Sequence, residues 1–238
     1  MIWFSFKGVR SSNFGILEKL PLDARAEKIT SYVETPDGMP IPYETNGFKT
    51  LIITVNLGIS DVSPANLDAI DAWLIGEGEL VFSNDPNRYY LAVCNKSLVG
   101  SRIIKELGKL QIQFTILPFK RSVRTWETIE LSEPENNVSQ GWIELSESMY
   151  YAEPVIKVYG NGDISIRRFL PGRSVVARNI TDYVIFDVEK NSVYDKDGNI
   201  IENETTSGLS AFRLESASAM IEFENATGAE VIKNMRWL

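Results

Sequence analysis

The side chains that could do chemistry in this chain are limited by what it lacks. Its 238 residues include no histidine and one cysteine, Cys94. Without an imidazole the chain has no usual general base near neutral pH, no Ser-His or Cys-His nucleophile, and no common nitrogen ligand for transition metals. Cys94 can form no intrachain disulfide, and we interpret it as a small buried hydrophobic residue. These absences argue against most hydrolase and metalloenzyme mechanisms.

Carboxylates are the remaining candidates for acid–base or metal chemistry, since paired Asp and Glu can hydrolyse glycosidic bonds. The 32 acidic residues are scattered through segments that resemble surface or turn, and we interpret them as solvated. DKDGN at residues 195–199 starts like a calcium loop but lacks the later ligands, so Asp-Gly predicts a hairpin turn. GNG at residues 160–162 lacks the rest of a dinucleotide fingerprint and predicts a strand-end turn. We therefore predict that the protein is not an enzyme and has no catalytic residue, cofactor or metal.

Composition and charge restrict the partners. The hydrophobic share of 44% and charged share of 24% are ordinary for a globular protein. No apolar run approaches the roughly 20 residues of a membrane span, and no secretory signal is visible, so we expect a soluble product made in the cytoplasm. A net charge of -8 disfavours stable nucleic-acid binding. A positively charged cluster runs against this negative net charge and consists of Lys120, Arg121 and Arg124. It is either a solvated stretch, which we favour, or a contact for an acidic neighbour.

The elements that position these groups are mainly strands. Residues 2–6, 29–35, 50–57 and 79–82 are rich in aromatic and β-branched side chains, and residues 110–116 alternate apolar with polar. Ser63 and Pro64 suit the start of a helix, after which Leu67, Ile70 and Leu74 recur at helical spacing. The first half is therefore predicted to be β-rich with one short helix.

The second half predicts a second domain. Residues 126–140 have the polar, breaker-containing character of a connector, which separates a domain at 1–125 from one at 141–238. Beyond it, short strands are expected at 155–159, 183–188, 220–223 and 231–237, punctuated by GNGD, DKDGN and NATG. This spacing favours a β-sandwich.

Four segments together resemble a known family. They are WLIGEGELVFSNDPNRYYLA (73–92), FSFKGVRSSNFGI (4–16), VETPDG (33–38) and AEPVIKVYGNGDISI (152–166). Their order and spacing resemble those of the distal tail proteins of long-tailed, non-contractile bacteriophages, although Asp37 and Met39 stand where the family often has Gly and Arg. The resemblance spans nearly the whole chain.

The resemblance implies a structural role in the virion tail. It implies an N-terminal, β-sandwich-like ring domain, a C-terminal galectin-like β-sandwich, and a homohexameric ring that joins the tail tube protein to tail-tip or baseplate proteins. The side chains that carry the likeness in the ring domain, and that could reach a subunit interface, are Phe6, Gly8, Phe14, Gly15, Trp73, Tyr89 and Tyr90. For Trp73, Tyr89 and Tyr90 we favour burial in the core.

Sugar binding is the alternative function. A galectin-like sandwich could present aromatic rings to a glycan of the host surface, and the candidate platform is Trp142, Tyr150, Tyr151 and Tyr159. The missing histidine removes a side chain that galectins commonly use. Core and subunit packing are therefore the interpretation that we favour for these aromatic residues.

Overall fold

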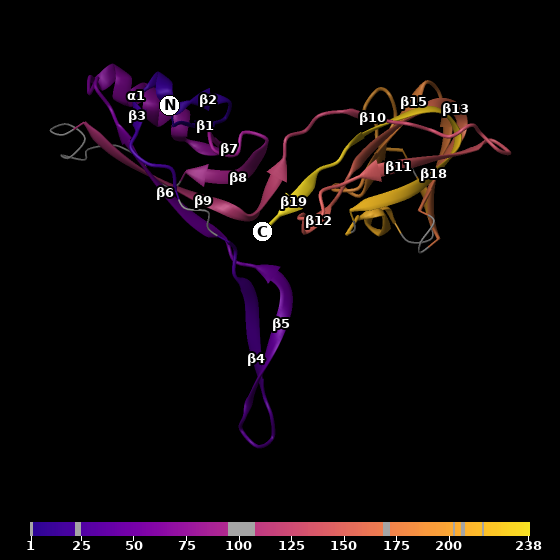
Figure 1. Ribbon diagram of the computed structural model, residues 1–238, viewed down its shortest axis with the longest axis horizontal. Coiled ribbons are helices and arrows are strands. Elements are labelled where there is room, and N and C mark those ends of the chain that lie inside the picture. Colours follow the sequence, from indigo (N-terminus) through magenta and orange to yellow (C-terminus); the bar gives the residue numbers. More distant parts are fainter. Residues whose placement is uncertain are drawn as a thin grey trace. The chain divides into compact units, whose positions relative to one another are not determined.

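The structure, a computed structural model, describes residues 2–21, 25–94, 108–168, 172–201, 203–205, 208–215 and 217–238. The chain divides into two compact units, one up to Lys120 that also takes Leu238, and one from Arg121 to Trp237. In both units the described elements are almost all strands (Figure 1). The mainly β fold with one α-helix is therefore confirmed for the described residues.

The first unit consists of short antiparallel strands and the α-helix. Its elements are β1 (Phe4–Phe6), β2 (Val9–Arg10), η1 (Ser11–Asn13), β3 (Ile16–Leu17), β4 (Lys28–Glu34), β5 (Pro40–Phe48), β6 (Leu51–Gly58), α1 (Pro64–Leu74), β7 (Gly76–Phe82), β8 (Arg88–Cys94) and β9 (Lys109–Ser122). The strands β9-β8-β7-β1-β2 lie in that order in one sheet, with β6 against β9 and β3 against β6. The strands β4 and β5 form a separate two-stranded sheet.

The sheet of the first unit rolls over its own core. Phe114 on β9 lies 5.8 Å from the ring of Phe4 and 5.1 Å from that of Phe6, although β8 and β7 separate β9 from β1 in the sheet. A twisted sheet can close over apolar side chains in this way. The sandwich-like arrangement that was expected for this unit thus comes from one curled sheet.

The helix α1 begins and ends as its sequence predicts. The Ser63 hydroxyl accepts a hydrogen bond from the backbone of Asn66 at 3.4 Å, and Pro64 opens the first turn. At the other end Gly76 takes a positive φ of 85°, which glycine adopts without steric cost. The residues between them bury Ile70, Trp73 and Leu74 against the sheet.

The second unit is a sandwich made by two long bent strands. Its elements are β10 (Glu127–Ile129), β11 (Val138–Glu144), β12 (Tyr151–Ala152), β13 (Val155–Arg168), β14 (Arg173–Ile180), β15 (Tyr183–Asp187), β16 (Ser192–Tyr194), β17 (Asn203–Thr205), η2 (Leu209–Phe212), β18 (Ser218–Ile232) and β19 (Met235–Trp237). The first part of β13 pairs with β15 and its second part with β14, while both parts pair with β18. The bends let β13 and β18 contribute to both layers of the sandwich, and the apolar core lies between the layers.

The bend explains a difference from the sequence prediction. Residues 160–163 and 225–228 were expected as turns between strands, yet both lie inside the continuous strands β13 and β18. The register between the strands shifts at Gly160, where a Cβ atom would lie 2.3 Å from the carbonyl oxygen of Asn225. Glycine therefore permits a sharp corner in a strand that continues, as in a β-bulge.

The expected connector also differs. Residues 126–140 contribute β10 and the start of β11, both paired with β18, and the structure divides the chain after Lys120 rather than after residue 125. Glu133, Pro134 and Asn136 do form the loop between the two strands. Polar composition hid these strands because each exposes one face to solvent.

Trp73 provides a test of the first unit's core. We expect Trp73→Ala to lower the free energy of unfolding by about 3–5 kcal/mol, because a buried indole leaves a cavity. The exposed Trp142, on β11 of the other unit, is the matched control, and Trp142→Ala should change stability by less than about 0.5 kcal/mol. Urea titrations followed by near-UV circular dichroism measure both, and equal losses would contradict the packing described.

Candidate functional site

The aromatic motif residues of the first unit surround one indole. The ring of Trp73 stacks on Phe14 at 4.8 Å and on Phe4 at 5.5 Å between centroids. Its Nε1–H donates a hydrogen bond of 2.8 Å to the backbone carbonyl of Phe6. The helix end and the N-terminal strand, which are 67 residues apart in sequence, are joined by this contact. Burial of Trp73 confirms the interpretation that we favoured for it.

The remaining motif residues also act within the unit. Gly8 has a φ of 77° in the turn after β1, and a Cβ atom on Gly15 would lie 2.3 Å from the carbonyl oxygen of Gly58. Tyr89 and Tyr90 are both buried on β8. These positions are explained by the folding of one protomer, and an interface role for any of them stays a prediction.

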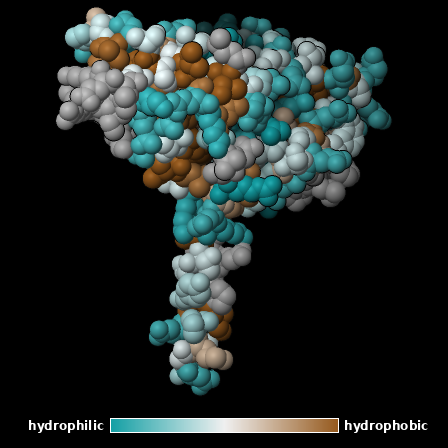
Figure 2. All heavy atoms as spheres, turned by 60° about the vertical axis from the view of Figure 1, so that its left-hand side comes forward, coloured by the Kyte–Doolittle hydropathy of each residue, from teal (hydrophilic) through white to brown (hydrophobic). Residues whose placement is uncertain are grey.

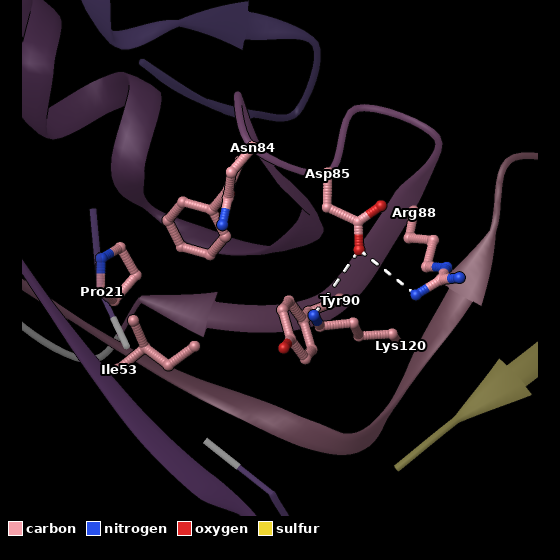
Figure 3. A pocket seen from close by; sticks show the side chains of 8 residues that line it. Pro21, Ile53, Asn84, Asp85, Arg88, Tyr90 and Lys120 are labelled. Carbon is pink, nitrogen blue, oxygen red and sulfur yellow. Dashed lines mark ion pairs between the residues drawn. The ribbon is translucent and has the colours of Figure 1, made fainter. Parts of the chain in front are cut away.

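A small pocket on the first unit holds a carboxylate between two cations (Figure 3). Asp85 lies 3.6 Å from Arg88 and 3.6 Å from Lys120, whose ammonium is 5.6 Å from the ring centroid of Tyr90. Pro21, Ile53 and Phe82 are among the apolar residues that line the rest. The ion pairs of Asp85 stabilise the β7–β8 turn.

The hairpin of β4 and β5 exposes apolar side chains. Val33 pairs with Ile41 in the ladder and therefore shares a face with it, and they are 59% and 54% exposed. Tyr32 and Met39 are exposed too, at 68% and 69%. The hairpin projects from the first unit, and Figure 2 shows hydrophobic residues on its surface. A two-stranded hairpin alone is marginally stable in water, so this exposure needs an explanation.

The four residues of the expected sugar platform differ in exposure and in what packs on them. Tyr151 is buried, with the guanidinium of Arg213 at 3.7 Å from its ring centroid. Tyr159 carries the ammonium of Lys157 at 4.6 Å from its centroid. Tyr150 packs edge-on against Tyr151 and is 42% exposed, whereas Trp142 on β11 is 59% exposed. A sugar-binding role for these four side chains stays a prediction.

A charge cluster that the sequence did not reveal lies in the second unit. Glu189 accepts from the guanidinium groups of Arg121, Arg124 and Arg236, the last two at 3.0 Å, and from the Asn234 amide at 3.0 Å. Burial raises the pKa of the Glu189 carboxyl, but the three guanidinium groups outweigh it and lower the pKa below its usual value.

This cluster corrects the interpretation of Lys120, Arg121 and Arg124 as a solvated stretch. Arg121 and Arg124 bind Glu189, and Lys120 binds Asp85. No local signal could have indicated this, because the acceptor carboxylate lies 65 residues or more away from the arginines in sequence.

The DKDGN segment forms the predicted turn. The Asp195 carboxylate accepts from the backbone amides of Asp197 and Asn199, at 2.9 and 2.8 Å. Hydrogen bonds from the Asn199 side chain and from backbone amides lower the pKa of Asp195. Across the described ranges no group of three or more Asp, Glu or Cys side chains could hold a metal ion. In that same part of the chain no helix is long and apolar enough to cross a membrane.

Comparison with known proteins identifies the fold. No family model and no curated protein matches the sequence. The structure resembles the Dit protein of phage SPP1, described as a paradigm of the hub adsorption apparatus in phages that infect Gram-positive bacteria, with a TM-score of 0.67, 10% identity and all of both chains covered. It also resembles a chain of the phage P2 baseplate in its activated conformation with Ca, with a TM-score of 0.54, 9% identity, and 100% of this chain and 98% of that chain covered. The resemblance that the sequence motifs predict is thus confirmed as a shared fold.

The Glu189 cluster yields a pH-dependent prediction. Glu189→Gln should lower the free energy of unfolding by about 1–3 kcal/mol at pH 7, less than for a fully buried pair because Arg124 is solvent-exposed. Glu215→Gln, which removes an exposed partner of Arg213, is the control and should have little effect.

The difference between wild type and Glu189→Gln should shrink in acid. The folded-state pKa of Glu189 is depressed, so its stabilisation is present above the ordinary glutamate pKa of 4.5 and is lost as pH falls through the folded-state pKa. Urea titrations at a series of pH values from neutrality down measure this. A difference that stays constant below pH 4.5 would contradict the ion-pair account.

Proposed function

We propose that this chain, which shares the fold of the SPP1 Dit protein, is a structural hub of a bacteriophage tail tip or baseplate. In this proposal six copies form a ring that joins the tail tube protein to the distal proteins of the tail. The exposed hairpin of β4 and β5 is the observation that carries the proposal. The role requires assembly and no catalysis, in agreement with a chain that lacks histidine.

The hairpin fits a second copy of this chain. Val33 and Ile41 form an apolar pair on one face, and Ile29 and Tyr32 add further exposed apolar surface along β4. Burying an aliphatic side chain stabilises by about 1.5–3 kcal/mol, so docking several of them would supply a substantial part of an interface. A hairpin held against a neighbour would also gain the packing that it lacks by itself.

Cyclic closure explains how such an arm can be exposed without uncontrolled growth. When each copy places its hairpin on the next copy, the contact is heterologous. Such an assembly stops growing only if the rotation from copy to copy closes into a ring. The charged ends of the hairpin, where Lys49 pairs with Glu27 at 3.0 Å, would remain at the rim of that contact. The hexameric number follows the family resemblance.

The other partners follow from the position of such a ring in the virion. We propose contacts with the tail tube protein on one side and with tail-tip or baseplate proteins on the other. Genome DNA would pass without stable binding, because a chain with a net charge of -8 repels phosphate. The protein would be made in the host cytoplasm and would end up in the phage tail.

Assembly can be tested on the apolar pair of the hairpin. Val33→Glu combined with Ile41→Lys should abolish the ring, because two charges would enter the buried contact. Size-exclusion chromatography with light scattering, together with negative-stain imaging, should show rings for the wild type at high concentration and monomers for the variant.

The control also replaces an exposed aliphatic residue by a charged one, but in the other unit. Ile200→Glu replaces an isoleucine of the second unit that is 71% exposed, and it should leave the ring intact. Circular dichroism and thermal unfolding should be unchanged for the hairpin variant, since Val33 and Ile41 belong to neither core cluster. A wild-type chain that stays monomeric at every concentration, or a variant that still forms rings, would refute the hairpin contact.

A further inference from the structure

The first unit carries a groove on the outward side of β6, with a volume of about 370 Å³. Lys19, Leu20 and Pro21, from the segment after β3, line it together with residues of β6 that include Ile52 and Thr54. Successive residues of a strand point to opposite faces, so Ile52 faces outward while the next residue enters the core. Ile52 is 68% exposed and belongs to neither core cluster. The groove therefore offers an apolar wall that the protomer itself leaves open.

The hairpin of the same copy is attached beside this groove and does not fill it. The strand β5 ends at Phe48 and β6 begins at Leu51, so the groove lies on the strand that follows the base of the hairpin (Figure 1). The apolar pair of Val33 and Ile41 lies near the far end of the hairpin. That end is roughly 20 Å from the base, at a rise of about 3.3 Å per residue. Folding the arm back onto its own base would break the β4–β5 ladder, so the pair can reach such a groove only on another copy.

The charges of the two surfaces are complementary. The far end of the hairpin, residues 31–41, contains Glu34 and Asp37 and no lysine or arginine. Lys19 is the charged residue of the groove lining, and among the residues that the structure describes it makes no ion pair. The adjacent Glu18 is already paired with Lys109 at 3.1 Å. An acidic arm and a groove with an unpaired ammonium group attract each other, which favours one orientation of the arm.

We propose that the β6 groove is the surface on which the hairpin of the next copy in the ring docks. This inference rests on the proposed ring and adds its acceptor surface. The apolar pair of the arm would pack on Ile52 and Leu20, where both sides lose contact with water, and Lys19 would pair with a carboxylate of the arm. Each copy has one arm and one groove, so each donates one contact and accepts another, as a heterologous ring requires.

Substitution of Ile52 tests the groove. Ile52→Glu should raise the protein concentration at which half of the chains are in rings by at least about tenfold, because its carboxylate would be buried against the arm. Ile75→Glu is the matched control, since Ile75 is also 68% exposed, in the same unit but outside the groove, and this variant should assemble like the wild type. Light scattering over a concentration series measures both. Rings of Ile52→Glu at wild-type concentrations would overturn the groove alone, whereas a wild type that is monomeric at every concentration would refute the ring as well.

A mixture of two assembly-deficient variants separates loss of the contact from loss of folding. The double variant Val33→Glu, Ile41→Lys lacks the arm contact and keeps the groove, whereas Ile52→Glu keeps the arm and lacks the groove. At a concentration at which the wild type forms rings, each variant alone should be monomeric. An equimolar mixture should give heterodimers that grow no further, because only one intact contact is possible between them. A mixture that stays monomeric would refute the assignment.

Exchange of charges tests the orientation of the arm. Lys19→Glu should raise the concentration needed for assembly by about threefold to tenfold, because it places a carboxylate opposite the acidic end of the hairpin. Combining it with Glu34→Lys and Asp37→Lys should restore assembly, since the attraction returns with reversed signs. Assembly of Lys19→Glu at wild-type concentrations, or a failure of the combined variant to recover, would contradict the pairing of Lys19 with the arm.

Discussion

A β-sheet has to bury one apolar face and satisfy its edges, and the two units meet this constraint in different ways. In the first unit one sheet rolls until Phe4 and Phe6 on β1 meet Phe114 on β9, and Trp73 of α1 fills the space against the N-terminal strand. In the second unit the long strands β13 and β18 pass through both layers and bend near Gly160. Backbone curvature, which small residues permit, is what encloses each core.

The same constraint decides which side chains of each unit stay on the surface. The core of the first unit buries Phe4, Phe6 and Trp73, whereas the hairpin of β4 and β5 leaves apolar side chains exposed. In the second unit the inward rows supply the core, and the outward row of β11 carries Trp142 beside charged neighbours.

Local signals predicted much of the fold. Ser63 and Pro64 set the start of the helix, and the alternation at residues 110–116 buries Leu110, Ile112, Phe114 and Ile116 as expected. The turns at Gly38 and Gly198 also follow from their residue types. The prediction failed where the signal had two interpretations: Gly160 and Gly162 suit a turn as well as a bend, and the polar residues of 126–140 suit a connector as well as a half-exposed strand. In both cases the structure that forms depends on the strand with which the segment pairs, which the local sequence does not contain.

What the sequence determined by itself was the class of protein: β-rich, acidic, without an imidazole, and with motifs in the order that the distal tail proteins share. Composition and local spacing are sufficient for the first three properties, and the order of the motifs is a resemblance to that family. Only the tertiary structure decided which side chains face outward, as for Trp142 on β11, and which distant residues meet, as for Glu189 with its arginines. The physical reason is that exposure and charge pairing are set by contacts between strands far apart in the chain, and no local pattern records them.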